Sequence, residues 1–299
     1  MNKVVKIPYT REWVAAYSHF PISKNKEVNM QICIMYNKPG MDYLDEVPQI
    51  SFEYREKDDT IEEFIKRHET QHCYIKITQT ELTKPATVTR LQNLKNANEN
   101  WSLIVTIENK SNLDLFLEVL KETCHGYIFD TPARTWFELQ DQLNCGVSEV
   151  YISGYLGFCW PEVKKECEKF NVKTRAIVNY ADGANYKGAP AIKKFFIRPE
   201  DMKYYVDYID AIEFFGPGSY QEVCYKAYTN GEWFGDISEI VLNLDHELDS
   251  RRVAGLFGEV RMKCGMRCLR GSRCSICHSL EDFAKVLEKT DTILDPKAD

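Results

Sequence analysis

The sequence contains no apolar run that approaches the ~20 residues of a membrane-spanning helix. Its first residues, MNKVVKIPYTREWV, also lack the apolar core of a signal peptide, because the polar stretch 9–12 interrupts the run. We therefore expect a cytoplasmic protein that has no membrane partner.

Several motifs of large enzyme classes are absent as well. The chain has no G-x-S-x-G, P-loop, H-E-x-x-H or complete G-x-G-x-x-G motif, which argues against the hydrolases, nucleotidases, metallopeptidases and dinucleotide-binding proteins that carry them. Basic residues are fewer than acidic ones, 38 against 45, and the formal net charge is −7. This balance argues against a general nucleic-acid-binding surface, although a local basic patch stays open.

What the sequence does have is a regular alternation of short apolar runs with amphipathic segments. Eight strand-then-helix units are predicted, with strands at 50–55, 73–78, 102–107, 126–131, 148–153, 172–180, 211–215 and 237–244. Short strands alternating with helices favour parallel pairing through right-handed crossovers. Eight such units predict an α/β fold of the (β/α)8 TIM-like barrel type. An open, doubly wound sheet is the alternative, because a sequence does not show closure.

The units divide the chain into three parts. Residues 1–48 form an N-terminal extension, in which MQICIMYN predicts an extra strand or a hairpin. Residues 49–257 form the barrel. Residues 258–299 hold a cysteine-rich segment followed by the amphipathic helix SLEDFAKVLEKT.

The 11 cysteines are unevenly distributed. Seven are scattered through apolar patterns and are expected to be small buried side chains. The other four fall close together with the spacing C-x3-C-x5-C-x2-C: Cys264, Cys268, Cys274 and Cys277. In a reducing compartment such a cluster predicts a metal site rather than disulfides.

The identity of the metal stays open. A [4Fe–4S] cluster and a zinc ion both accept four thiolates, and we expect the iron–sulfur cluster with Zn2+ as the alternative. Three arginines, Arg267, Arg270 and Arg273, alternate with the cysteines and are expected to offset their charge or to bind an anionic group. The metal would either tie the last helix to the barrel or lie beside a substrate.

If the fold is a barrel, catalytic residues belong at the carboxyl ends of its strands. The candidates there are Asp130, Asn179, Asp245 and His246. Asp130 ends a strand just before a predicted helix, so it is either an acid–base residue or a helix cap. Within a strand, Arg175 would bind an anion if it points inward, and would need a carboxylate partner if it points outward.

The segment LQDQLNCGVSEVYISGYLGFCWPEVKKECEKFNVKTRAIVN, residues 139–179, resembles the collagenase-like peptidase family. That resemblance implies a barrel enzyme that carries an iron–sulfur cluster and hydroxylates RNA bases or ubiquinone precursors. In the family the segment lies nearer the start of the barrel, and the cluster cysteines are more dispersed. The stretch YTNGEWFGDISEIV together with the cysteine cluster resembles uncharacterised bacteriophage proteins, which implies a viral or prophage origin and no activity.

Three functions are compatible with these observations. The first is a metal-binding barrel enzyme that modifies an RNA, a nucleotide or another small anionic substrate. The second is a non-enzymatic binding or assembly protein with a zinc staple. The third is a barrel lyase or isomerase that uses Asp130 and the glycine-rich loop 216–219, where a plain turn is the simpler interpretation. We take the first as the main hypothesis.

Overall fold

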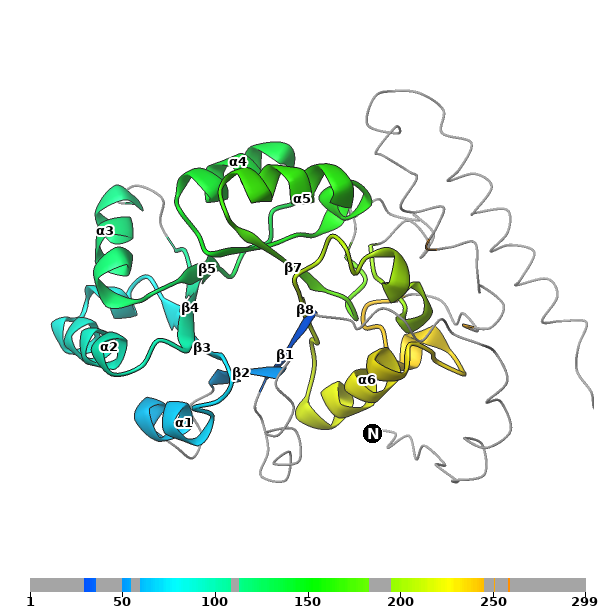
Figure 1. Ribbon diagram of the computed structural model, residues 1–299, viewed down its shortest axis with the longest axis horizontal. Helices are drawn as coiled ribbons and strands as arrows, with labels where there is room; N and C mark the ends of the chain where they lie inside the picture. The colour runs from blue at the N-terminus through cyan, green and yellow to red at the C-terminus, as the bar shows by residue number, and fades with distance from the viewer. Residues whose placement is uncertain are drawn as a thin grey trace, which may run out of the picture.

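Eight parallel strands form one sheet that curves into a ring (Figure 1). The computed structural model describes residues 30–35, 50–54, 60–108, 113–182, 195–244, 250 and 258. The sheet order is β5-β4-β3-β2-β1-β8-β7-β6. The strands are β1 Gln31–Met35, β2 Ile50–Tyr54, β3 Cys73–Thr78, β4 Trp101–Thr106, β5 Tyr127–Phe129, β6 Glu149–Tyr151, β7 Lys173–Ile177 and β8 Ala211–Glu213.

The two ends of this order, β5 and β6, also meet. The Ser148 amide donates to the Tyr127 carbonyl over 2.9 Å, and Ala133 forms a parallel bridge with Ile152. The sheet is therefore a nearly closed barrel. The predicted (β/α)8 TIM-like fold is confirmed, and the open doubly wound sheet is wrong.

Helices surround the ring of strands (Figure 1). The α-helices are α1 Ile61–Arg67, α2 Pro85–Ala97, α3 Leu113–Thr123, α4 Trp136–Asn144, α5 Trp160–Lys169 and α6 Gly218–Asn230. Shorter 3-10 helices are η2 Glu81–Thr83, η4 Gly154–Phe158, η6 Pro199–Tyr204 and η7 Ile237–Glu239. α1 and α4 both begin with a capping box, in which a threonine and the glutamate three residues later satisfy each other's backbone amides.

The structure differs from the sequence prediction at the seam of the barrel, the place in the sheet between β2 and β8. The extra strand predicted in the N-terminal extension is β1, which lies between β2 and β8, with Ile32 opposite Ile50 and Gln31 opposite Ala211. The predicted eighth strand, 237–244, is wrong: it forms η7 and a turn, with one isolated bridge between Leu242 and Tyr180. Although the backbone of this segment is irregular, its apolar side chains, among them Ile240, are buried in the core. The run is apolar because it fills the core, not because it pairs in the sheet.

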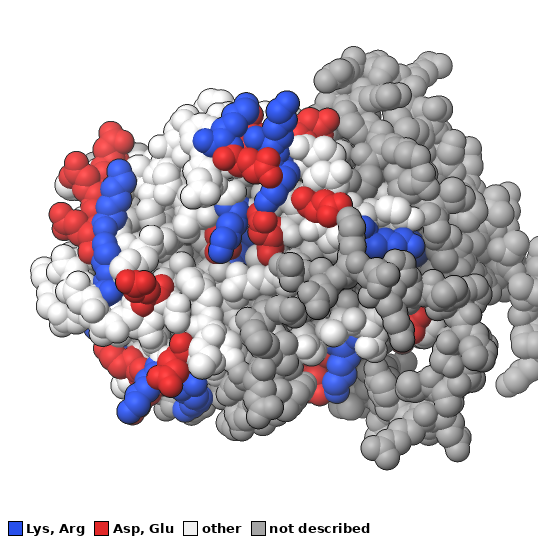
Figure 2. Space-filling model, in the orientation of Figure 1, with Lys and Arg blue, Asp and Glu red and all other residues white. Residues whose placement is uncertain are grey.

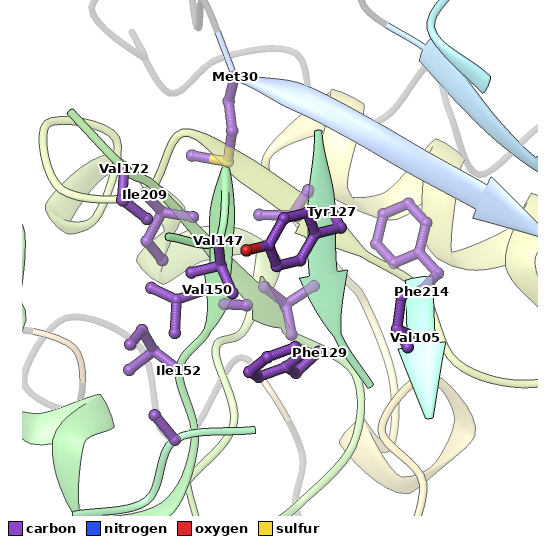
Figure 3. Packing of buried hydrophobic residues seen from close by; sticks show 14 of the residues in the cluster. Met30, Val105, Tyr127, Phe129, Val147, Val150, Ile152, Val172, Ile209 and Phe214 are labelled. Carbon is purple, nitrogen blue, oxygen red and sulfur yellow. The ribbon is translucent and has the colours of Figure 1, made fainter. Parts of the chain in front are cut away.

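The main hydrophobic core lies between the strands and the surrounding helices, where outward-facing side chains such as Val105, Val150 and Phe214 are buried (Figure 3). A second, smaller apolar cluster lies apart from it and includes Cys33, Tyr74, Ile104, Ile128 and Tyr151. These two sets come from alternate positions of the same strands, as expected when successive side chains point to opposite faces. The smaller cluster therefore fills the interior of the barrel.

The scattered cysteines are buried as expected, apart from the half-buried Cys145. Among the helices of the described ranges, none is both long enough and apolar enough to cross a membrane.

Candidate active site at the carboxyl-terminal end of the barrel

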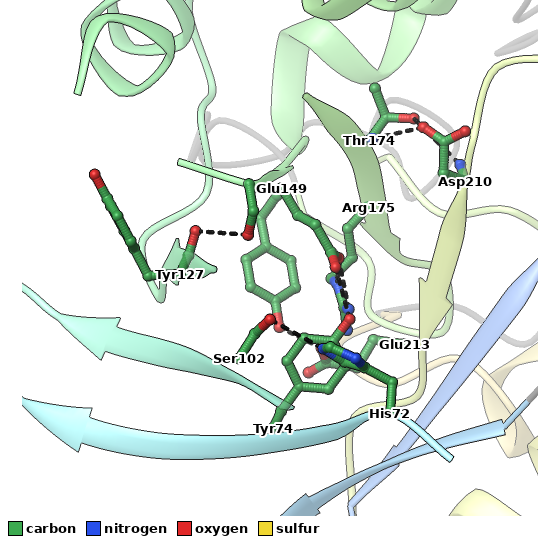
Figure 4. Close-up of polar contacts among 11 residues, drawn as sticks. His72, Tyr74, Ser102, Tyr127, Glu149, Thr174, Arg175, Asp210 and Glu213 are labelled. Atoms are coloured by element: carbon green, nitrogen blue, oxygen red, sulfur yellow. Dashed lines mark hydrogen bonds and ion pairs between the residues drawn. The ribbon is translucent and has the colours of Figure 1, made fainter. Parts of the chain in front are cut away.

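The interior of the barrel contains a buried ion cluster built around Arg175 of β7 (Figure 4). The Arg175 side chain is 0% exposed, and its Nε and Nη2 donate to Oε2 of Glu149 over 3.0 and 2.7 Å. Its Nη1 lies 3.4 Å from Oε2 of Glu213. Barrel interiors are usually filled by branched aliphatic side chains, so a charged layer here is unusual.

Two tyrosines complete the cluster. The Tyr74 hydroxyl donates to Oε1 of Glu149 over 2.7 Å, and the Tyr151 hydroxyl donates to Glu213. The Arg175 guanidinium also lies over the Tyr74 ring, 4.2 Å from its centroid. Both carboxylates therefore have a charged partner and a hydroxyl partner, as buried charges require.

The two carboxylates differ in basicity. Burial raises the pKa of both, but at Glu149 the charge of Arg175 and the hydrogen bond from Tyr74 outweigh burial and leave the pKa below its usual value. At Glu213 burial prevails over Arg175 and Tyr151, and the pKa is raised. A third glutamate, Glu53 of β2, is also buried. A proton is therefore held more readily at Glu213 than at Glu149.

Above this cluster, an accessible ion pair lies at the carboxyl ends of β3 and β5. The Lys76 Nζ lies 3.0 Å from both carboxylate oxygens of Asp130, and Thr106 donates its hydroxyl to Asp130 over 3.2 Å. The side chains of Lys76 and Asp130 are 45% and 33% exposed. In barrels of parallel strands the substrate binds at the carboxyl ends of the strands, so the pair lies where a substrate can reach it.

A second charged group continues along the same rim. Asp182, just after β7, accepts a hydrogen bond from the Ser153 hydroxyl, and Nε of Arg134 lies 3.6 Å from the same carboxylate. The three residues follow β7, β6 and β5, so they continue the rim from the strand that carries Asp130 to β7.

Asp130 lies at the mouth, as the sequence predicted. Its alternative role as a helix cap does not fit, because α4 begins at Trp136 and is capped by Thr135. Asn179 follows β7 but is fully buried, and its side-chain amide bonds to the backbone of Phe215. Its contacts are those of a residue that fixes a loop.

The remaining sequence-predicted site residues lie outside the described residues, so their roles stay predictions. They are Asp245, His246, Cys264, Cys268, Cys274, Cys277, Arg267, Arg270 and Arg273. Within the described ranges, no group of three or more His, Cys, Asp or Glu side chains is arranged to hold a metal ion.

Sequence reasoning missed Lys76, Glu149 and Glu213. A charged residue within the apolar run CYIKIT was a signal for Lys76, as Lys173 and Arg175 were in β7. Arg175 points inward but is matched by carboxylates, so its expected role in binding an anion does not fit. On the face shown in Figure 2, basic and acidic side chains of the described residues are interspersed.

No family model matches the sequence. The chain is 34% identical over 101 residues to a protein of Methanocaldococcus jannaschii named "Uncharacterized protease MJ1657", an alignment that covers 31% of this chain and 29% of the archaeal protein. A solved structure of Vibrio cholerae LapD (S helix-GGDEF-EAL, bound to c-di-GMP) aligns with a TM-score of 0.31 and 14% identity over 40% of this chain and 34% of that one, too little to carry an argument. This chain is thus similar, over less than a third of its length, to a protein that is named as a protease.

Proposed function

We propose that this protein is a barrel enzyme that binds a small anionic substrate at the carboxyl-terminal mouth and uses Asp130 for proton transfer. The observation that carries the proposal is the accessible Lys76–Asp130 pair, which lies at the end of the barrel where substrates bind in such folds. We place this activity in the cytoplasm. An RNA phosphate could present the same anionic group as a small molecule.

The pair supplies both recognition and chemistry. The ammonium of Lys76 is an accessible cation at the mouth, so an incoming phosphate or carboxylate competes with Asp130 for it. When Lys76 turns toward the substrate, the Asp130 carboxylate is left facing the substrate without its cation partner. Thr106 keeps the carboxylate in place through its hydroxyl. Substrate binding thereby leaves the Asp130 carboxylate available as a general base.

We further propose that Cys264, Cys268, Cys274 and Cys277 hold a [4Fe–4S] cluster, with Arg267, Arg270 and Arg273 beside it. The support is their spacing and the resemblance to the collagenase-like peptidase family. The likeness to an archaeal protein named as a protease agrees with that resemblance. An iron–sulfur cluster would supply electron transfer, whereas a zinc ion would serve as a structural staple of a non-enzymatic protein.

Calorimetric titration of the full chain with inorganic phosphate tests the mouth. Lys76→Met should weaken phosphate binding by about tenfold, the loss expected for one charge-assisted contact. Lys226→Met is the matched control, because Lys226 is 54% exposed and pairs with Glu222 on the outer helix α6. An equal effect of both variants, or no effect of Lys76→Met, would contradict the proposal.

The competition between Asp130 and the anion has its own readout. Asp130→Asn removes the carboxylate that pairs with Lys76, so phosphate should bind more tightly to the variant in the same titration. Unchanged phosphate affinity in Asp130→Asn would show that Asp130 does not compete with the anion for Lys76.

A further inference from the structure

We infer that Tyr180 and Phe215 form a stacking subsite at the mouth, so that the substrate is an aromatic anion: a planar ring joined to a phosphate or carboxylate group. The inference rests on the proposed function and adds the part of the substrate that the charged residues do not recognise.

The two rings lie together at the carboxyl ends of β7 and β8. Their centroids are 5.4 Å apart with an interplanar angle of 68°, an edge-to-face arrangement. Phe215 is 45% exposed, whereas its neighbour Phe214 is fully buried in the core against Tyr228. The packing role of this aromatic dipeptide is therefore filled by Phe214, and Phe215 presents its ring to the mouth.

The backbone that carries Phe215 is held on both sides by buried amides. The Asn179 side chain donates to the Phe215 carbonyl over 2.9 Å and accepts from the Phe215 amide over 2.7 Å. The Gln221 side chain donates to the carbonyls of Phe214 and Gly216 over 2.9 and 3.0 Å. Both amide side chains are 0% exposed. An exposed ring on so constrained a loop loses little freedom when a ligand stacks on it, and this favours binding.

The subsite continues into the charged rim. Tyr180 lies two residues before Asp182, which contacts Ser153 and Arg134. The mouth therefore presents an aromatic surface at β7–β8, and the cations Arg134 and Lys76 toward β5 and β3. A molecule with a flat ring at one end and an anionic group at the other matches this order. Exposed aromatic side chains are known to bind planar rings in this way, for example when the bases of single-stranded nucleic acids stack on them.

The test compares probes with and without a ring, titrated against the full chain. Phenyl phosphate should bind about tenfold more tightly than inorganic phosphate, and benzoate more tightly than acetate, since stacking of one ring contributes at this level. Adenosine 5′-monophosphate against ribose 5-phosphate extends the comparison to a larger ring. Phe215→Ala should remove the advantage of every ring-bearing probe and leave inorganic phosphate unaffected, while Phe215→Tyr should retain it.

Phe170→Ala is the matched control, because Phe170 is 42% exposed but follows the end of α5, away from the mouth. Phosphate binding that depends on Lys76, with no gain from a ring or no loss in Phe215→Ala, would overturn the stacking subsite alone. Failure of every anion to bind would overturn the proposed function and the subsite with it. A preference for phenyl phosphate over benzoate, or the reverse, identifies the anionic group.

Discussion

Arg175 and Glu149 form an ion pair inside the barrel, with two nitrogens of the guanidinium donating to a single carboxylate oxygen over 3.0 and 2.7 Å. They come from the neighbouring strands β7 and β6, whose register places Arg175 beside Tyr151. Both side chains are almost fully buried, 0% and 5% exposed, so each charge depends on the other.

Replacing either glutamate of the ion cluster should reveal their difference. Glu149→Gln leaves Arg175 without its main counter-charge and should lower the free energy of unfolding by about 3–5 kcal/mol. Glu213→Gln should cost about 1 kcal/mol, because the raised pKa of Glu213 shows that its neutral form is tolerated and an amide resembles that form. Urea unfolding at pH 7 measures both. Equal losses would contradict the assignment.

Glu213 also predicts how the free energy of unfolding changes with pH. A raised pKa means that the folded chain holds the Glu213 proton more tightly than the unfolded chain, so this stability is complete below pH 4.5 and is lost as pH rises through the folded pKa. Glu213→Gln does not ionise. The variant should therefore gain stability relative to the unsubstituted protein as pH rises from 4.5, and a constant difference would count against a raised pKa.

His72 should make the protein sensitive to mild acid. Burial lowers its pKa from 6.5 to about 4, and its Nε2 lies 2.9 Å from the Ser102 hydroxyl. Because the unfolded chain takes up the proton first, stability should fall as pH decreases from 6.5 toward 4, by up to about 3 kcal/mol. His72→Gln should be flatter over this range when urea unfolding is measured at several pH values. A parallel decline in the variant would assign the acid sensitivity to other groups.

The cysteine cluster predicts a metal content that elemental analysis can measure after anaerobic purification. About four irons per chain with a broad absorption band near 400 nm would support a [4Fe–4S] cluster, and one zinc in a colourless protein would support the staple. Cys268→Ser should release the metal and lower the melting temperature. Cys145→Ser is the control, since Cys145 is a scattered, half-buried cysteine. Unchanged metal content in Cys268→Ser would refute the four-thiolate site.

Gly157 should not tolerate a methyl group. A Cβ at this position in η4 would overlap the ring of Phe195, which is buried and packs against Phe158 and Trp160. Gly157→Ala should therefore cost about 1–3 kcal/mol or more from overpacking. Gly231→Ala tests the backbone conformation alone, because Gly231 has φ +73° and nothing lies within 4 Å of the added carbon. This substitution should lower the free energy of unfolding by about 1 kcal/mol. Thermal unfolding of both variants decides which effect is larger.

The sequence alone was sufficient for the type of fold but not for its seam. The alternation of apolar strands and amphipathic helices is local, so it predicted the barrel correctly. Residues 237–244 were predicted as the eighth strand, but Gln31–Met35, predicted as an extra strand or hairpin outside the barrel, pairs with β8 in their place. Both runs are apolar, and pairing between distant segments leaves no local mark.

The site was predictable to a similar extent. The place of Asp130 after a strand was predictable because the end of a strand is visible in the sequence, and its catalytic role stays a prediction. Arg175 was noticed because a charge within an apolar strand is conspicuous. The partners Glu149 and Glu213 were missed because only the pairing of β7 with β6 and β8 brings them within reach of the Arg175 side chain. The role of Asn179 in holding Phe215 was hidden for the same reason, since the two residues are 36 positions apart.

The ion cluster also has a consequence for how the barrel is assembled. Its members come from β3, β6, β7 and β8, so the first four strands supply Tyr74 and the last four supply both carboxylates and the arginine. A chain that has made only half of the barrel leaves these charges in water, where their pairing contributes little. The cluster becomes dry and fully bonded only when the ring closes. Closure of the barrel and completion of the ion cluster therefore occur together. This coupling favours folding of the two halves together rather than as separable domains.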